Sequence, residues 1–213
     1  MSCIIPAAVG VYKYNKIDKR FHPLIYMMIL DVIFETIVYL AIKIQALAMG
    51  PLYLVNIYML SHFFLFLFFV FRNGYIGSKT RYVFVVAALV VASINAFYSG
   101  TLFNPFYYLL CYVSLVMLIV SIDILSKQIF ELKTRLVNNF WFWFGSASIL
   151  YNAFTLMIFA LYFFTMRDTP NGKAIGDIQH FANAVYYLLI AFALLKIPVK
   201  QLQYPGKLTG LKK

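Results

Sequence analysis

The sequence predicts an all-α, polytopic membrane protein with seven transmembrane helices, and three observations lead to this prediction. Of the 213 residues, 63% are hydrophobic and only 12% are charged, whereas soluble domains are nearer to half apolar and a quarter charged. The apolar residues fall into separate segments, most of them close to the twenty residues that a helix needs to cross a bilayer. Basic residues gather in alternate connections between these segments. Helices are the expected spanning elements, because irregular backbone exposed to lipid leaves its polar groups unsatisfied.

The seven apolar segments make up one predicted transmembrane domain, residues 1–203, followed by a short basic tail, residues 204–213. The predicted spans are about residues 2–12, 22–49, 52–71, 82–98, 106–125, 136–164 and 178–195. The first is long enough for only half a bilayer, so a re-entrant or interfacial segment is the alternative to a complete span. The second is followed by Gly50-Pro51, which we interpret as a turn.

Polar and turn-forming residues separate the remaining spans. The third ends before Arg72, and an uncharged turn that closes with Asn104-Pro105 follows the fourth. The segment SKQIFELKTR after the fifth span and the segment Thr165–Asp177 after the sixth are interpreted as loops. The sixth span opens with Trp141 and Trp143, and such aromatic residues are typical of the membrane interface.

The charges in the connections predict the orientation. The set of alternate connections that begins with residues 13–20 holds four, three and three basic residues, and the segment from Lys196 onward holds five. The intervening connections hold none, none and two, the last balanced by two acids. By the positive-inside rule the N-terminus is outside and the C-terminus is cytoplasmic. The formal charge of +11 is then a topology signal, and nucleic acid is not an expected partner.

The third and seventh spans share a weak pattern. VNIYMLSHFFLFLFF and ANAVYYLLIAFALL both place an asparagine, then an aromatic residue, then a long apolar run. If the first three and last three spans are related, the fourth is a linker, and the protein has a parallel three-one-three repeat. The alternative is that apolar, aromatic helices resemble one another by chance.

Ionisable residues within the second span are the strongest indication of a functional site. Asp31, Glu35, Tyr39 and Lys43 follow one another at four-residue steps, which places them along one stripe of a helix. Ionisable groups at membrane depth are costly, and they usually face a bundle interior or a wet cavity. Lys43 lies near a span end and can reach water by snorkelling, as can Asp123.

Depth along each span suggests which side chains could meet. Glu35 and His62 are expected near mid-membrane, with Asp31 somewhat nearer the cytoplasm. The predicted ligand-binding residues are Glu35, His62, Asp31, Asn56, Asn183, Tyr187 and Asn152. A Glu–His pair at this depth can bind a polar ligand or relay a proton. For the asparagines and tyrosines the competing interpretation is structural, since such groups often only join helices.

Signatures of catalysis are missing from the sequence. It contains no HExxH zinc motif, no GxSxG elbow and no glycine-rich phosphate loop. We therefore predict no catalytic residue, no metal site and no cofactor. The two cysteines, Cys3 and Cys111, are too far apart in the chain to suggest a metal site. An intramembrane lipid hydrolase acting through Asp31, Glu35 and Asp123 and an oligomeric pore stay open as alternatives.

The segment YKYNKIDKRF after the first span and LVNIYML in the third resemble stand-alone bacterial seven-helix membrane proteins of uncharacterised function. This resemblance implies the inner (plasma) membrane of a bacterium and no particular chemistry. The number of spans, the topology and the chain length are also similar to the SWEET and PQ-loop carriers. Their Pro-Gln pair is absent, because Ala7 follows Pro6 and Phe106 follows Pro105.

These observations favour a receptor-like or sensory protein that lies in the lipid bilayer. It would bind a small or lipid-like ligand between its helices and signal through a cytoplasmic or membrane partner. The alternative is a carrier for a small polar solute, proton-coupled through Glu35. Oligomers are compatible with either function.

Overall fold

The computed structural model describes residues 2–44, 50–99, 107–131, 136–161 and 172–198, and these form a bundle of seven α-helices. The helices are α1 (Ile4–Lys13), α2 (His22–Ile44), α3 (Gly50–Arg72), α4 (Ser78–Ser99), α5 (Tyr107–Glu131), α6 (Phe140–Leu161) and α7 (Gly172–Leu195). Short 3₁₀ turns at Tyr14–Lys16, Lys19–Phe21 and Leu136–Asn138 occur at the connections.

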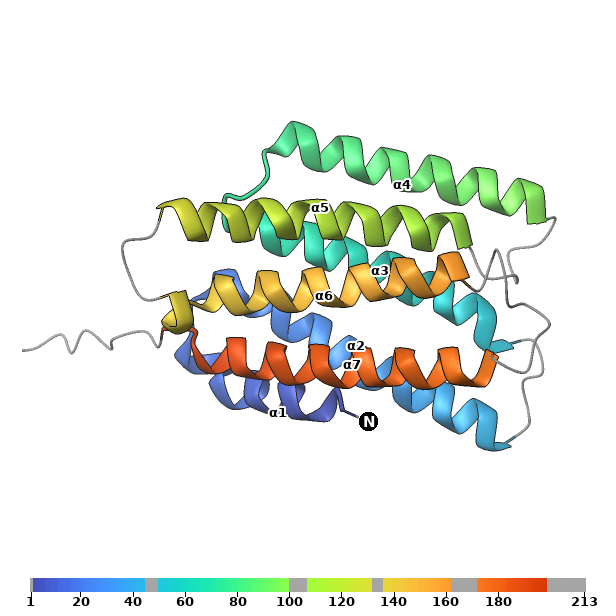
Figure 1. The fold of residues 1–213 in the computed structure, drawn as a ribbon, viewed down its shortest axis with the longest axis horizontal. Coiled ribbons are helices and arrows are strands. Elements are labelled where there is room, and N and C mark those ends of the chain that lie inside the picture. The colour runs from blue at the N-terminus through green and yellow to red at the C-terminus, as the bar shows by residue number, and fades with distance from the viewer. Residues whose placement is uncertain (1, 45–49, 100–106, 132–135, 162–171, 199–213) are drawn as a thin grey trace, which may run out of the picture.

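Six of the helices form a ring around the interior. Contacts join α1 to α2, α2 to α3, α3 to α5, α5 to α6, α6 to α7, and α7 back to α1. The remaining helix, α4, packs outside this ring against α5 and α3, and Figure 1 shows it at the edge of the bundle. The internal repeat stays a prediction, although the helix it assigns as a linker is the peripheral one.

Four segments are long and apolar enough to cross a membrane: Lys19–Leu40, Tyr108–Phe130, Phe140–Ala160 and Ile178–Leu195. A shorter apolar segment covers Asn56–Arg72. The protein is therefore an all-α protein with membrane-spanning helices, and the total of seven spans stays a prediction. The ten residues of α1 extend about 15 Å, roughly half of the bilayer core.

Several predicted boundaries are wrong, because helices continue past the apolar segments. The fifth helix runs to Glu131 through part of a segment interpreted as a loop. There Lys127 pairs with Asp123 at 2.7 Å, and Gln128 donates a hydrogen bond to the Tyr75 hydroxyl. Polar side chains satisfied in this way allow a helix to continue beyond the membrane.

The other boundary corrections concern the starts of α3, α4, α6 and α7. Gly50-Pro51 begins α3 rather than forming a turn, since proline is well tolerated in the first turn of a helix. α4 begins at Ser78, and α7 begins at Gly172, inside a predicted loop. α6 begins at Phe140, where the Asn139 side chain accepts a hydrogen bond from the Trp141 backbone N–H and so caps the helix. Residues 45–49, 162–164 and 204–213 of the predicted spans and tail lie outside the described residues.

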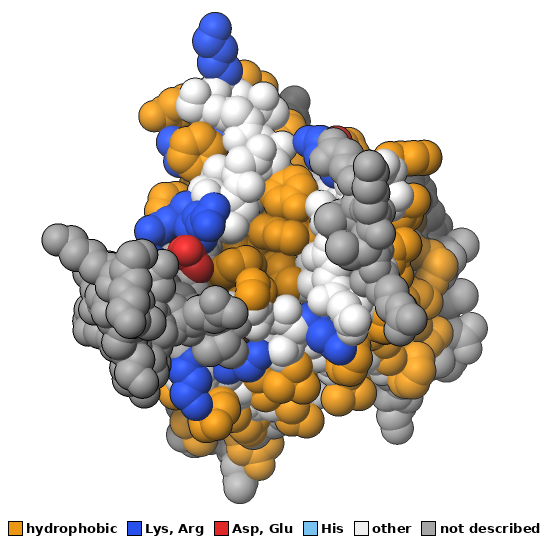
Figure 2. All heavy atoms as spheres, turned by 90° about the vertical axis from the view of Figure 1, so that its left-hand side faces the viewer, with side chains coloured by type: hydrophobic (Ala, Val, Ile, Leu, Met, Phe, Trp, Pro, Cys, Tyr) orange, Lys and Arg blue, Asp and Glu red, His pale blue; other side chains and the backbone are white. Residues whose placement is uncertain are grey.

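The two ends of the bundle differ in charge. Every lysine and arginine whose side chain the structure describes lies at the end where α1 finishes and α2 begins. Figure 2 looks onto this end, which we call the basic end, and shows these side chains around exposed hydrophobic groups. Its basic side chains are Lys13, Lys16, Lys19, Arg20, Arg72, Lys79, Arg81, Lys127 and Lys196.

Lys13 fixes α1 to the end of α7. Its Nζ donates hydrogen bonds to the carbonyl oxygens of Leu195 at 2.7 Å and Leu194 at 3.1 Å, which the helix itself leaves unsatisfied. Burial of the ammonium group and, less strongly, the neighbouring Lys16 lower the pKa of Lys13 from its ordinary value. Gly10 brings α1 close to α2, because a Cβ at this position would lie 3.2 Å from Ile25 Cγ2.

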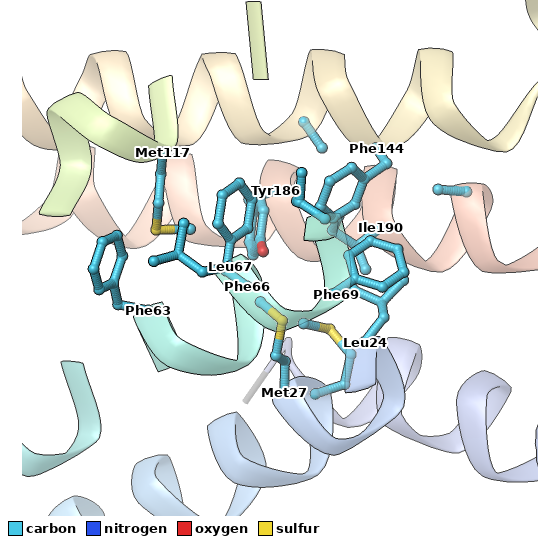
Figure 3. Packing of buried hydrophobic residues seen from close by; sticks show 14 of the residues in the cluster. Leu24, Met27, Phe63, Phe66, Leu67, Phe69, Met117, Phe144, Tyr186 and Ile190 are labelled. Carbon is cyan, nitrogen blue, oxygen red and sulfur yellow. The ribbon is translucent and has the colours of Figure 1, made fainter. Parts of the chain in front are cut away.

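An aromatic cluster fills the interior next to the basic end. It consists of Phe21, Phe66, Phe69, Phe140, Trp141 and Phe144. The Phe69 ring stacks on Trp141 with centroids 5.1 Å apart and meets Phe144 edge-on at 5.2 Å. Figure 3 shows Phe66, Phe69 and Phe144 packed with Leu24 and Met27 of α2. Dense van der Waals packing of this kind is what holds helices together in lipid.

Candidate ligand-binding cavity

Five helices of the ring surround a cavity of about 400 Å³, which we call the inner cavity. It lies away from the basic end: Glu35 is in the second half of α2, Ser114 in the first half of α5 and Thr155 in the second half of α6. Its lining residues are Phe34, Glu35, Tyr58, Met59, His62, Leu110, Val113, Ser114, Met117, Tyr151, Thr155, Ile158, Phe159, Gln179, Asn183 and Tyr187. Mostly apolar walls with a few convergent polar groups are typical of small-molecule sites.

A buried carboxyl group lies beside the inner cavity. Asp31 is 1% exposed, and its Oδ1 accepts a hydrogen bond from the Tyr58 hydroxyl at 2.8 Å. The same oxygen lies 3.6 Å from Nε2 of His62. Within the described part of the chain, the buried Oδ2 atom has no hydrogen-bond partner, although the Tyr187 hydroxyl is near enough to interact with the carboxyl group electrostatically.

This arrangement corrects the pairing inferred from depth. The sequence placed His62 level with Glu35, whereas His62 lies beside Asp31, one helical turn nearer the basic end. The Asp31 carboxyl group, the Tyr58 hydroxyl and the His62 ring therefore form a connected polar group, which we call the Asp31 cluster. Such a cluster can hold a proton in a site from which water is largely excluded.

Glu35 stands apart from this cluster and lines the inner cavity itself. Its Oε2 atom accepts a hydrogen bond from the Cys3 thiol at 3.0 Å, across the α1–α2 contact. A thiol is a weak donor, so this carboxyl group keeps most of its capacity to accept hydrogen bonds. The predicted stripe turns away from the interior beyond Glu35, since Tyr39 is 51% exposed, and the Lys43 side chain lies outside the described residues.

Aromatic rings form much of the cavity wall. The rings of Phe34 and Tyr58 stack in parallel, with centroids 4.0 Å apart and planes 10° apart. Tyr151 and Tyr187 also line the cavity, and the Tyr186 ring packs against both, with centroid distances of 4.6 Å and 5.2 Å. Stacked rings of this kind present rigid faces of negative potential to a bound group.

The three asparagines predicted to bind a ligand occupy different environments. Asn183 lines the cavity, and its Oδ1 accepts a hydrogen bond from Gln179 Nε2 at 3.1 Å. Asn152 is 1% exposed and donates from Nδ2 to the Ser148 carbonyl oxygen of its own helix at 2.7 Å. Asn56 is 5% exposed, and neither Asn56 nor Asn152 is among the residues that line the inner cavity. The structure thus brings Glu35, His62, Asn183 and Tyr187 together around one space.

Several lining residues were not singled out from the sequence. Tyr58 precedes His62 by four residues on α3, and this spacing was a signal that both share a face. Gln179 has the same relation to Asn183 on α7, and its buried Oε1 has no hydrogen-bond partner among the described residues. Ser114 and Thr155 gave no signal, because isolated hydroxyl residues are common in membrane helices.

A second hollow, of about 570 Å³, lies beside the inner cavity at the side of the bundle. We call it the side hollow. It shares Phe34, Glu35 and Asn183 with the inner cavity, so these side chains stand between the two spaces. Its other lining residues are Ser2, Val38, Tyr39, His180 and Ala184.

Among the described residues, no group of three or more His, Cys, Asp or Glu side chains is placed to hold a metal ion. Comparison of the chain with protein-family models, with curated proteins and with solved structures finds no match. The chemistry of the inner cavity is therefore argued from its own residues. These offer carboxyl, amide and hydroxyl groups for hydrogen bonds together with aromatic faces, and the Asp31 cluster lies beside them.

Proposed function

We propose that this protein is a receptor-like membrane protein that binds a small or lipid-like ligand in the inner cavity. The cavity is the observation that carries the proposal, since five helices converge on it with Glu35, Gln179 and Asn183 at its wall. With the basic end in the cytoplasm, as the positive-inside rule favours, the ligand is held in the outer half of the membrane.

The difference in packing between the two halves supports a signalling role. The inner cavity occupies one half of the bundle, and the aromatic cluster fills the half next to the basic end. Both are built on α3, which carries Tyr58 and His62 at the cavity and Phe69 in the cluster. A ligand that moves α3 can therefore repack rings at the basic end. The lysines and arginines there would meet a membrane or cytoplasmic signalling partner.

The proposal is tested by filling the cavity. Ser114 is 3% exposed and lines the cavity, whereas the next residue, Leu115, is 48% exposed on the outside of the same helix. We expect Ser114→Phe to lose a compound that co-purifies with the wild-type protein, detected by native mass spectrometry after release from nanodiscs. Leu115→Phe should retain it. Glu35→Gln, which preserves the shape of the side chain, provides a second variant if Ser114→Phe does not fold. An identical set of bound compounds in wild type and all three variants would overturn the proposal.

The Asp31 cluster favours a second candidate function, a proton-coupled carrier for a small polar solute. The sequence assigned the proton to Glu35, but the carboxyl group with a histidine at 3.6 Å is Asp31. A carrier would move the co-purified compound into proteoliposomes in response to a pH gradient. Asp31→Asn would then remove the dependence on the gradient while leaving binding in place. Binding without any uptake would favour the receptor.

A further inference from the structure

The side hollow provides a path from the inner cavity to the edge of the bundle. α1 (Ile4–Lys13) packs against α2 and α7, and Figure 1 shows that this short helix covers only part of the length of the bundle. The side hollow begins beside the start of α1, at Ser2, and continues between α2 and α7 past Val38 and His180. Phe34, Glu35 and Asn183 line both the side hollow and the inner cavity.

Two of the hydrogen-bond acceptors around these spaces have little or no donor from the described residues. From the described residues, Glu35 accepts a hydrogen bond from the Cys3 thiol alone, and the buried Gln179 Oε1 accepts none. A ligand that satisfies these atoms must donate hydrogen bonds, because a buried acceptor without a donor is costly.

The charge of the lining residues favours a cationic hydrogen-bond donor on the ligand over a neutral one. Among the described residues that line the two spaces there is no lysine or arginine, whereas the acidic residue Glu35 lines both. The stacked Phe34–Tyr58 rings and the Tyr151 and Tyr187 rings lie around the same carboxyl group. Aromatic faces combined with a carboxylate are a favourable environment for an ammonium group. An anionic head group would meet the Glu35 carboxylate without a compensating positive charge.

From these observations we propose that the ligand is an amphiphile with an amine or ammonium head group. The head binds at Glu35, Gln179 and Asn183, and its hydrocarbon chain passes through the side hollow between α2 and α7 into the bilayer. This inference rests on the proposed function, since it specifies the ligand class and the entry route of the same cavity.

The head group is tested with three long-chain probes of equal length: an alkylamine, the corresponding alcohol and the corresponding carboxylic acid. We expect the purified protein in nanodiscs to bind the amine at least about tenfold more tightly than the other two, as one charge-assisted hydrogen bond allows. Glu35→Gln should remove most of this preference. Equal or tighter binding of the alcohol or the acid, or an unchanged preference in Glu35→Gln, would overturn the inference.

The route of the chain is tested with a matched pair of variants on α2. Val38 lines the side hollow, whereas its neighbour Ile37 is 41% exposed. We expect Val38→Trp to weaken binding of the long-chain amine about tenfold and Ile37→Trp to leave it unchanged. A photoreactive group in the chain should label α2 and α7. Equal binding in both variants, or labelling confined to α5 and α6, would overturn the lateral route.

The outcomes separate this inference from the proposed function. If Ser114→Phe displaces a co-purified compound with which the alkylamine does not compete, the cavity binds a ligand and only the assignment of its class is wrong. If no compound co-purifies and none of the three probes binds, the receptor proposal is wrong as well.

Discussion

Removing the Tyr58 hydroxyl should destabilise the protein measurably, although the change deletes a single oxygen atom. Tyr58→Phe keeps the ring that stacks on Phe34 and removes the hydrogen bond to Asp31 Oδ1, which is 2.8 Å long. The buried carboxyl group then loses the neutral donor that α3 supplies to it. The His62 ring remains 3.6 Å from the same oxygen.

Two sets of magnitudes bound the expected loss. Hydrogen bonds between transmembrane helices average about 0.6 kcal/mol and reach about 1.7 kcal/mol. Hydrogen bonds to charged groups in proteins contribute about 1.5–3 kcal/mol. The ranges meet near 1.5 kcal/mol, so we expect Tyr58→Phe to lower the free energy of unfolding by about that amount. For a chain of this length the melting temperature should fall by roughly 3–6 °C.

The assay compares two tyrosine substitutions in the same detergent. Tyr14 and Tyr26 share an exposed hydrogen bond of 2.7 Å, whose oxygens can bond to water instead, so Tyr14→Phe should cost less than about 0.5 kcal/mol. In an Asp31→Asn background, the cost of Tyr58→Phe should shrink by about 0.5–1 kcal/mol, because the carboxyl group that accepts the Tyr58 hydrogen bond is then absent. Equal losses for Tyr58→Phe and Tyr14→Phe, or no coupling to Asp31, would refute this reasoning.

Three further predictions concern packing. Lys13→Met should destabilise the protein by about 1 kcal/mol in a denaturation curve, since the Leu195 carbonyl loses the Lys13 ammonium donor and the Leu194 carbonyl keeps only the Ile197 N–H. No loss of stability would contradict that contact. Gly145→Ala should be neutral or stabilising by up to about 1 kcal/mol, because its new Cβ meets nothing closer than 3.4 Å. Gly10→Ala should lower the free energy of unfolding relative to Gly145→Ala in the same assay, and equal effects would contradict the close α1–α2 approach. Phe144→Ala should lower the free energy of unfolding by about 3–5 kcal/mol. Phe130→Ala, at an 87% exposed position, should lower it by less than about 0.5 kcal/mol. Similar losses in the two variants would contradict the aromatic cluster.

The sequence predicted the fold class well because the length and hydropathy of a segment largely decide whether it forms a membrane helix. It predicted helix ends less well. Hydropathy reports where a segment meets lipid, whereas the end of a helix depends on its caps and local polar contacts. The Gln128 and Asn139 side chains, joined by a hydrogen bond of 2.6 Å, illustrate this at the connection between α5 and α6.

Within the candidate site, the sequence identified the residues better than their partners. Asp31 and Glu35 stood out because a carboxyl group at membrane depth is costly. Depth counted along a helix gives neither the rotation of that helix nor its offset from a neighbour. The structure therefore places His62 beside Asp31 rather than Glu35, and it leaves Asn152 bonded within its own helix. The cavity depends on all five helices, so no single segment could have indicated it.

The most direct measurement is a cryo-electron microscopy structure of the protein in lipid nanodiscs, at a resolution that shows side chains and bound molecules. We predict density in the inner cavity that contacts Glu35 and Asn183 and does not belong to the protein. Its continuation through the side hollow between α2 and α7 would agree with an amphiphilic ligand. A tightly packed interior, with the lining side chains closed over the cavity and no bound molecule, would contradict the proposal that this protein binds a ligand within its bundle.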